Sequence, residues 1–351
     1  MDITPYLKLM VEKDASDLFL TVNSPVKVKI EGKATSVGKT TLTGELTKAA
    51  ADGIMNDYQK KQFAENLECD FAIPLGDEAR FRVNVFRQRG EVGLVLRRIP
   101  NEIPTIEKLG VPEILQELIM NKRGLILMVG ATGSGKSTTL AAMINHRNSN
   151  MLGHILTIED PVEFSHPNIK SIVNQREVGV DTHSYANALK ASLREAPDVI
   201  LIGEIRDRVT MEAALELSNT GHLAISTLHA NNANQAMERV INMFPQDMHK
   251  QLFMDLSLNI RAVISQRLVL ARDGKRCAAI EILINTPHIA ELILKGEIDE
   301  IKEAMNDSGQ KGMQTFDMAL YNLFKEERID LEEALNNADS RTNLEAKINF
   351  G

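Results

Sequence analysis

The sequence predicts an α/β protein in which a smaller α+β domain precedes a larger domain built on a mainly parallel sheet, with a helical C-terminal part. Three observations predict this class. The first 99 residues mix short helical patterns with strands in which apolar and polar residues alternate. From Leu125 onward, continuous apolar strands alternate with helices, as in sheets covered on both faces. A glycine-rich loop joins the first of those strands to a helix.

The N-terminal domain is expected to span residues 1–99. Its pattern predicts helices at 2–12 and 43–57 and strands at 17–21, 25–30, 81–86 and 92–99, with a turn at 31–32. Residues 100–112 carry three prolines (Pro100, Pro104 and Pro112) and no long periodic pattern, so we interpret them as a linker.

The second domain is expected to span residues 113–351. Its strands are predicted at 125–130, 154–159, 198–203 and 222–227, and its helices at 112–120, 136–147, 184–195 and 207–219. A hairpin follows at 269–272 and 277–283, joined by Asp273-Gly274. The remaining pattern is helical, at 287–295, 297–305, 316–325 and 330–337. We expect the final polar residues to be mobile.

Composition limits the function classes. Hydrophobic residues make up 43% and charged residues 25%, which is enough apolar material for sizeable cores. The net charge of −8 argues against an electrostatic pull toward nucleic acid or an anionic membrane. The sequence shows neither a signal peptide nor an apolar run of the ~18–20 residues that a spanning helix needs. Cys69 and Cys277 are interpreted as reduced thiols, and without a CxxC pair they make no cysteine zinc site.

The glycine-rich loop matches the pattern G-x-x-x-x-G-K-[ST] of a phosphate-binding loop, or P-loop. Glycines let the backbone turn its amides toward an anion, and the following helix adds free N–H groups and a positive dipole end. Lys136 is expected to reach the β- and γ-phosphates of ATP, and the Ser137 hydroxyl to bind Mg²⁺. The predicted nucleotide-binding residues are Gly130, Ala131, Thr132, Gly133, Ser134, Gly135, Lys136, Ser137 and Thr138.

Two groups of acidic residues follow strands of the second domain. Glu204 ends the apolar run DVILIG, and the cluster that ends with Glu163 follows the run HILTIE. The carboxyl edge of an open α/β sheet is where a ligand binds, so these acids are candidates to hold Mg²⁺ or water. Gly203 stands where this pattern usually has an aspartate, which favours a water-mediated contact between Glu204 and the metal. The alternative is that these acids are solvated loop residues.

Two histidines offer further candidates. His222 and His229 lie at opposite ends of one strand, and their spacing alone favours ordinary strand-end histidines over a metal site.

Arginines form three groups. Arg80 and Arg82 alternate on one strand and so share a face. The other two groups are Arg97 and Arg98, which lie on the next strand, and the arginines that flank Glu204, which are Arg194, Arg206 and Arg208. These arginines are either a solvated basic face or residues that complete a nucleotide site, from the same or a neighbouring subunit.

Four motifs in order resemble those of the type IV pilus and type II secretion ATPase superfamily: GATGSGKST, ILTIEDPVEF, LREAPDVILIGEIRD and TGHLAISTLH. The stretches ASDLFL and ARFRVNVF extend the resemblance to the N-terminal domain. Within the superfamily the chain is similar to the pilus-retraction branch, PilT and PilU. The stretches REAPD, LHANNANQA, DLSLNIRAVISQRLV and GMQTFDMALY are closer to PilU. Where PilT has an AIR-type motif, this chain has HIAELILKGE, which lacks the arginine.

The resemblance implies a hexameric ring of chains, each with a PAS-like N-terminal domain and a RecA-like P-loop domain. It implies that Glu163 activates water, that Glu204 is the Walker B acid, and that His229 supports the γ-phosphate region. It further implies that Arg80 and Arg82 reach the nucleotide at a domain or subunit interface.

The function implied is a cytoplasmic motor that hydrolyses ATP to retract type IV pili. It would work at the inner face of the cytoplasmic membrane and associate with the membrane only through partners such as the pilus platform protein. Whether it works alone or with a PilT-like ATPase stays open. The alternatives are a pilus-assembly or type II secretion ATPase, whose members typically carry a cysteine quartet that is missing here, a nucleic-acid translocase, and a nucleotide-binding scaffold without turnover. The acidic composition argues against a nucleic-acid partner.

Overall fold

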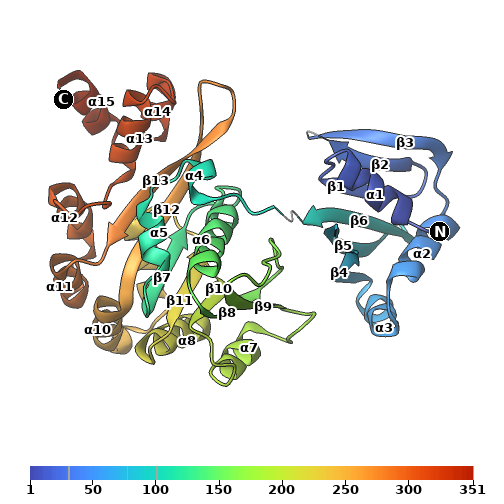
Figure 1. Cartoon of the computed structure of the whole chain (residues 1–351), viewed down its shortest axis with the longest axis horizontal. Helices are drawn as coiled ribbons and strands as arrows, with labels where there is room; N and C mark the ends of the chain where they lie inside the picture. Colours follow the sequence, from blue (N-terminus) through green and yellow to red (C-terminus); the bar gives the residue numbers. More distant parts are fainter. Residues whose placement is uncertain (31, 77, 100–101, 351) are drawn as a thin grey trace. The chain divides into compact units, whose positions relative to one another are not determined.

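The computed structural model describes residues 1–30, 32–76, 78–99 and 102–350 (Figure 1). The chain splits into two compact units: unit 1 is Met1–Glu102 together with Glu163–Ser165, and unit 2 is Ile103–Val162 together with His166–Gly351. Part of the predicted turn, Glu31, and the start of the predicted linker, residues 100–101, lie outside the described residues. The domain bounds expected from the sequence stay a prediction.

In its described residues, unit 1 is a six-stranded antiparallel sheet in the order β3-β2-β1-β6-β5-β4. Large buried side chains such as Phe71, Phe81 and Leu94 form its core. The strands are β1 Asp17–Leu20, β2 Pro25–Ile30, β3 Lys33–Thr41, β4 Glu68–Leu75, β5 Ala79–Gln88 and β6 Glu91–Ile99. The helices are α1 Thr4–Glu12, α2 Gly44–Ile54 and α3 Asp57–Asn66.

The sheet of unit 2 has the order β13-β12-β7-β11-β10-β8-β9, and its pairs are parallel except for the β12–β13 hairpin. All six residues of β7 are buried, which explains its continuous apolar run. The strands are β7 Gly124–Val129, β8 Gly153–Glu159, β9 Ser171–Glu177, β10 Val199–Glu204, β11 Leu223–Leu228, β12 Ile260–Leu270 and β13 Arg276–Ile284.

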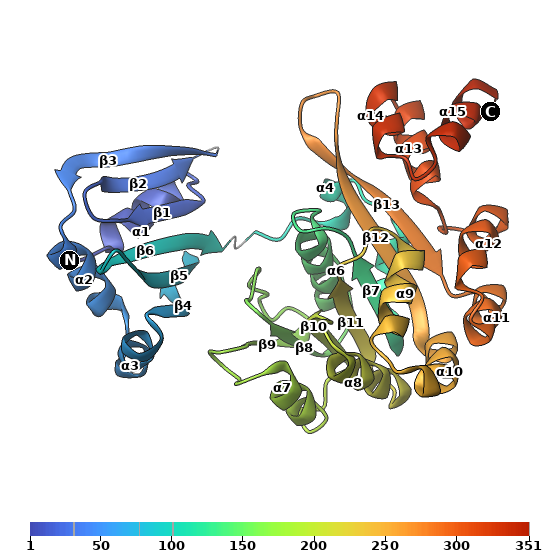
Figure 2. The same cartoon turned by 180° about the vertical axis from the view of Figure 1, so that it is seen from behind.

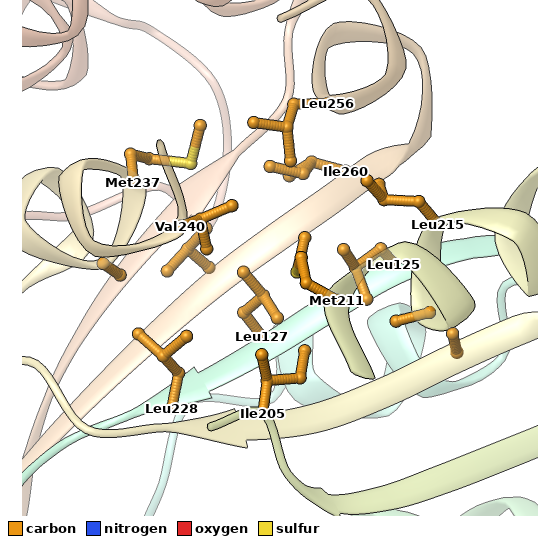
Figure 3. Close-up of a cluster of buried hydrophobic side chains, with 14 of the residues drawn as sticks. Leu125, Leu127, Ile205, Met211, Leu215, Leu228, Met237, Val240, Leu256 and Ile260 are labelled. Carbon is orange, nitrogen blue, oxygen red and sulfur yellow. The ribbon is translucent and has the colours of Figure 1, made fainter. Parts of the chain in front are cut away.

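Helices cover both faces of this sheet. Leu125 and Leu127 of β7 pack into one hydrophobic cluster, while Ile126 and Met128 pack into another. Figure 3 shows the first cluster, in which strand residues meet Met211 of α8 and other helical side chains. The helices of unit 2 are α4 Ile106–Leu109, α5 Ile114–Ile119, α6 Lys136–Asn150, α7 Tyr185–Ser192, α8 Arg208–Asn219, α9 Ala233–Asn242, α10 His249–Asn259, α11 Pro287–Lys295, α12 Ile301–Asp307, α13 Phe316–Lys325, α14 Leu331–Asn337 and α15 Arg341–Phe350, with short 3₁₀ turns at Gln246–Met248 and Ile298–Glu300.

The C-terminal helices lie beside the β12–β13 hairpin. Both views show α13, α14 and α15 together at this hairpin (Figures 1 and 2). The expectation that the final residues are mobile is wrong, because Arg341–Phe350 form α15 and Leu344 is buried against α13 and the hairpin. One apolar anchor therefore outweighs the polar composition of this segment.

The predicted fold class is confirmed: an antiparallel α+β unit precedes a unit with a parallel-rich sheet and a helical C-terminal part. The predicted hairpin was too short, since β12 begins at Ile260. Cys69 and Cys277 are free thiols. Within the described ranges, no helix is both long and apolar enough to cross a bilayer.

Candidate nucleotide site

The P-loop follows the buried strand β7 and leads into α6, as the sequence predicts. Its conformation requires glycine at two positions in particular. A Cβ at Gly130 would lie 2.6 Å from the carbonyl oxygen of Gln266, and one at Gly135 would lie 2.7 Å from Gln266 Nε2. Both glycines have positive φ, which most side chains avoid. The loop is therefore pressed against β12, with no room for side chains at these points.

Gln266 is the residue of β12 that fastens the P-loop. Its Nε2 donates to the Ser134 carbonyl at 2.9 Å, and its Oε1 accepts from Thr139 Oγ1 at 2.8 Å. The Gln266 residue is only 3% exposed. Hydrogen bonds in such a dry position are worth more than at the surface, because an unpaired partner would find no water. Both functional atoms of this side chain therefore fix the loop and the first turn of α6.

Lys136 places a positive charge inside the loop. Its Nζ donates to the Gly130 carbonyl at 2.7 Å and to the Ala131 carbonyl at 2.8 Å. Burial lowers the pKa of Lys136, and the nearby Glu204 carboxylate opposes that shift. Among the described residues, the buried Ser134 Oγ has no hydrogen-bond partner. A buried cation and an unpaired hydroxyl are what an anion would satisfy, so the residues present fit a bound phosphate group.

Glu204 lies at the carboxyl end of β10 between two basic side chains. Arg206 Nε donates to its Oε2 at 2.7 Å, and His229 Nε2 lies 3.4 Å from its Oε1. The hydrogen bond to Glu204 raises the pKa of Arg206. Glu204 and His229 end neighbouring parallel strands, β10 and the strand β11 that leads to His229, which is why their side chains meet. The side chain of Glu204 is 17% exposed and thus held in one place at the rim of the site.

The end of β8 supplies further acids to this edge. Glu159 Oε1 accepts from Thr157 Oγ1 at 2.6 Å, and Arg206 Nη1 lies 3.9 Å from Asp160 Oδ2. Tyr185 lies among these charges, and burial together with the neighbouring acids raises the pKa of its hydroxyl. These contacts make a continuous polar edge along the ends of β8 and β10.

Tyr185 also explains the glycine that precedes Glu204. A Cβ at Gly203 would lie 2.6 Å from Tyr185 Oη and 3.2 Å from both the Glu159 Cα and the Ile158 carbonyl oxygen. The side chain of an aspartate at this position would clash with Tyr185 Oη and would crowd the Glu159 Cα and the Ile158 carbonyl oxygen. The departure from the usual acidic pair therefore follows from packing against Tyr185 and β8.

The structure brings Lys136, Glu204 and His229 together in unit 2, with Ser137 exposed on the first turn of α6 and Thr138 half-buried behind it. His222 lies at the other end of β11, where its Nδ1 is 3.1 Å from the Leu217 carbonyl oxygen, as an ordinary strand-end histidine would.

The three other predicted residues belong to unit 1. Arg80 and Arg82 lie on β5 and alternate with buried Phe81, so they share the face opposite the core. Arg82 is directly opposite Arg97 of β6. Glu163 is exposed and is grouped with unit 1. The roles expected for these residues stay predictions.

Comparison with known proteins places the chain. The family model described as "Type II/IV secretion system protein" matches residues 2–331. The chain belongs to this family. It is 54% identical to "Type IV pilus ATPase PilU" of Pseudomonas aeruginosa, over 100% of this chain and 92% of that protein. It is 42% identical to the "Type IV pilus retractation ATPase PilT" of the same organism, over 95% of this chain and 97% of that protein.

A solved structure supports the same family assignment. The crystal structure titled for the pilus retraction motor PilT and bound ADP matches with a TM-score of 0.92 at 41% identity, over 98% of this chain and 99% of that chain. The resemblance to the PilT and PilU branch, inferred from the four motifs, is confirmed. This chain therefore has the same fold as that ADP-bound PilT.

Sequence reasoning missed Gln266 and Tyr185. For Gln266 a signal existed, because Ser265-Gln266 directly follows the apolar run Ala262–Ile264, and the structure shows that both residues are buried. Polar residues in a buried strand need partners, so such a pair marks a contact worth seeking. Tyr185 left no comparable signal, since its site depends on where α7 meets the ends of β8 and β10.

Proposed function

We propose that this protein hydrolyses ATP and uses the energy to drive type IV pilus retraction. The observation that carries the proposal is the 54% identity with PilU over the whole chain. The geometry supports it, because a P-loop with a buried lysine faces a glutamate held by Arg206 and His229. A scaffold that binds a nucleotide without hydrolysing it would not require a glutamate fixed by Arg206 and His229 beside the P-loop lysine.

The proposed site uses the P-loop residues Gly130–Thr138 for the phosphates of ATP, with Lys136 toward the β- and γ-phosphates. Ser137 and Glu204 would hold Mg²⁺, and their hydroxyl and carboxylate oxygens are ligands that this hard cation prefers. Bound Mg²⁺ neutralises charge on the phosphates. His229 keeps Glu204 oriented, and Glu163 takes a proton from the attacking water.

A pair of amide variants tests the assigned roles. Glu163→Gln keeps the shape of the side chain and removes the base, so it should bind ATP and lose hydrolysis. Glu204→Gln should weaken Mg²⁺-dependent binding as well. Equilibrium binding of a fluorescent ATP analogue and single-turnover hydrolysis separate the two effects. If Glu163→Gln hydrolysed ATP like the wild type while Glu204→Gln bound ATP and did not, the roles would be reversed.

The proposed assembly is a homo-hexamer in which Arg80 and Arg82 complete a neighbour's nucleotide site. Two guanidinium groups on one face repel unless an anion lies near them, and ATP is a suitable anion. Rings mixed from Arg82→Ala and Lys136→Ala subunits should regain part of the activity, because some interfaces then pair an intact arginine with an intact P-loop. Mixed rings that form and stay inactive would count against a shared site.

The proposed place of action is the cytoplasmic face of the inner membrane, reached through the pilus platform protein and without a nucleic-acid partner. Retraction measured in cells that lack this protein, a PilT-like ATPase, or both would show whether it acts alone. We expect cells that lack only this protein to lose retraction. The wild-type gene should restore it, and the gene for the Lys136→Ala variant should not. Lost pilus assembly or lost protein secretion would favour the assembly or secretion ATPase instead.

A further inference from the structure

The loop that follows β11 connects the edge of the nucleotide site with the interior of unit 2. This loop, here the His229 loop, consists of His229, Ala230, Asn231, Asn232 and Ala233. It starts at His229, whose Nε2 is 3.4 Å from Glu204 Oε1, and ends at Ala233, the first residue of α9. Its position therefore determines where His229 lies against Glu204.

Two side chains of the β12–β13 hairpin hold the His229 loop from the other side. Arg267 Nη2 donates to the Asn231 carbonyl at 3.1 Å, and Glu281 Oε1 accepts from the Ala233 amide at 2.7 Å. Arg267 directly follows Gln266, which fastens the P-loop, and successive strand residues point to opposite faces. One strand thus holds the P-loop with one side chain and the His229 loop with the next.

Arg267 is fixed in turn by the C-terminal helices. Its Nη1 donates to the Asn337 carbonyl at 2.8 Å, its Nη2 lies 2.6 Å from Asp339 Oδ1, and its guanidinium carbon lies 3.9 Å from the centre of the Phe316 ring. The Arg267 side chain is 25% exposed, so much of this contact is shielded from water. A planar guanidinium satisfied on several sides has few alternative positions.

Asp339 connects these contacts. Its Oδ2 accepts from Lys302 Nζ at 2.9 Å, and its own amide donates to Asp317 Oδ1 at 2.8 Å. Burial raises the pKa of Asp339, but its bonds to Lys302 and Arg267 outweigh that effect and lower the pKa overall. The carboxylate is therefore ionised at neutral pH and fixed between α12, α13 and the hairpin.

We propose that Asp339 is a positioning residue for ATP hydrolysis, which through Arg267 holds the His229 loop against Glu204. This inference rests on the proposed function. It means that a rearrangement of α13–α15 changes the position of His229, and that a change at the nucleotide site is felt by these helices in return. The C-terminal helices are thereby a place where a partner of the motor can control turnover.

The test compares Asp339→Asn with Asp330→Asn. Asp330 directly precedes α14, and its Oδ1 pairs with Arg272 Nε at 2.7 Å. Its side chain is 71% exposed, so the control removes the same charge from the same region without touching the His229 loop. Asp339→Asn should lower kcat for ATP hydrolysis roughly 5- to 150-fold, the usual range of coupling between sites. Its KM for ATP should stay near the wild-type value, because Gln266 still holds the P-loop.

Hydrogen exchange gives a readout that does not depend on turnover. The Ala233 amide, bonded to Glu281, should exchange faster in Asp339→Asn than in the wild type and in Asp330→Asn. Asp339→Glu, which keeps the charge, should restore part of kcat. Equal kcat and equal Ala233 exchange in Asp339→Asn and Asp330→Asn would overturn the proposal.

A second variant covers the case in which Asp339→Asn does not fold. Arg267→Lys keeps the positive charge but loses the planar group that reaches Asn231, Asn337 and Asp339 together. It should also lower kcat and speed exchange at Ala233, and unchanged values of both would refute the proposal. A wild-type protein without ATP hydrolysis would refute the proposed function instead, while the exchange comparison would still decide whether Asp339 holds the loop.

Discussion

Replacing Gln266 with methionine should weaken nucleotide binding without unfolding the protein. Methionine has nearly the length and volume of glutamine, so the packing against β7 and α6 is kept. The substitution removes the donor to the Ser134 carbonyl and the acceptor for the Thr139 hydroxyl. Both partners then lie in an interior position where Gln266 itself is 3% exposed.

The magnitude follows from what each partner can do next. A buried polar group without a partner costs about 1–3 kcal/mol. The Thr139 hydroxyl can turn to the carbonyl one helical turn earlier, as threonines in helices do. The Ser134 carbonyl loses the donor that Gln266 supplies. The P-loop can give this carbonyl a new partner only by changing the conformation in which its backbone amides face the phosphates. That cost should appear in binding, so the Kd for ADP should rise about 5- to 150-fold, at 1.4 kcal/mol for each tenfold change.

Isothermal titration with ADP measures the effect, and Thr139→Val is the matched control. This control removes the other hydrogen bond of Gln266 and leaves the bond to the Ser134 carbonyl intact. Its Kd for ADP should stay within about threefold of the wild type, because the Ser134 carbonyl keeps its donor and the unpaired Gln266 Oε1 destabilises the free and the ADP-bound protein alike. If Gln266→Met bound ADP as tightly as Thr139→Val does, the inference that Gln266 shapes the P-loop would be wrong.

Two further predictions concern Glu281 and Gly203. Burial raises the pKa of Glu281 from its ordinary 4.5 to about 7, so its effect on stability is most favourable below pH 4.5 and is lost as pH rises to about 7. Glu281→Gln should therefore match the wild type near pH 4 and exceed its free energy of unfolding by up to about 3 kcal/mol at pH 8, in urea unfolding followed by circular dichroism. Equal stability of the two proteins at pH 8 would contradict this prediction. Gly203→Ala should lower kcat for ATP hydrolysis roughly tenfold. The added methyl group would push against the Tyr185 hydroxyl and the end of β8, at a cost of about 1–3 kcal/mol, and so displace the polar edge that holds Glu204. Adding Tyr185→Phe should recover part of that loss, and no recovery would show that β8 alone is displaced.

The fold class and the P-loop were predictable because their signals are local. The apolar run of β7 is continuous since all its residues are buried, and the loop needs glycines at fixed points to avoid β12. The order of strands brings Glu204 and His229 together, because parallel neighbours end at the same edge. The strand pattern made Glu204 a candidate for this reason, whereas the position of His229 near the phosphates was implied only by the family resemblance.

Other features were not predictable because they depend on distant partners. β3 was missed because it is exposed along most of its length and is defined by pairing with β2. β9 was missed because it is an edge strand with polar residues at Asn174 and Arg176. The tie between Arg267 and Asp339 spans a long stretch of chain, and neither residue carries a motif. Such contacts are visible only once the C-terminal helices are placed beside the hairpin.

The central claim is that this chain hydrolyses ATP at the P-loop that holds Lys136. Steady-state phosphate release by the purified wild type and by Lys136→Ala, with folding of both checked by circular dichroism, tests it most directly. We predict Mg²⁺-dependent release by the wild type and none above background by the folded Lys136→Ala protein, because its phosphate-facing charge is gone. Hydrolysis by Lys136→Ala at the wild-type rate, or none by a folded wild-type protein that binds ATP, would contradict the claim.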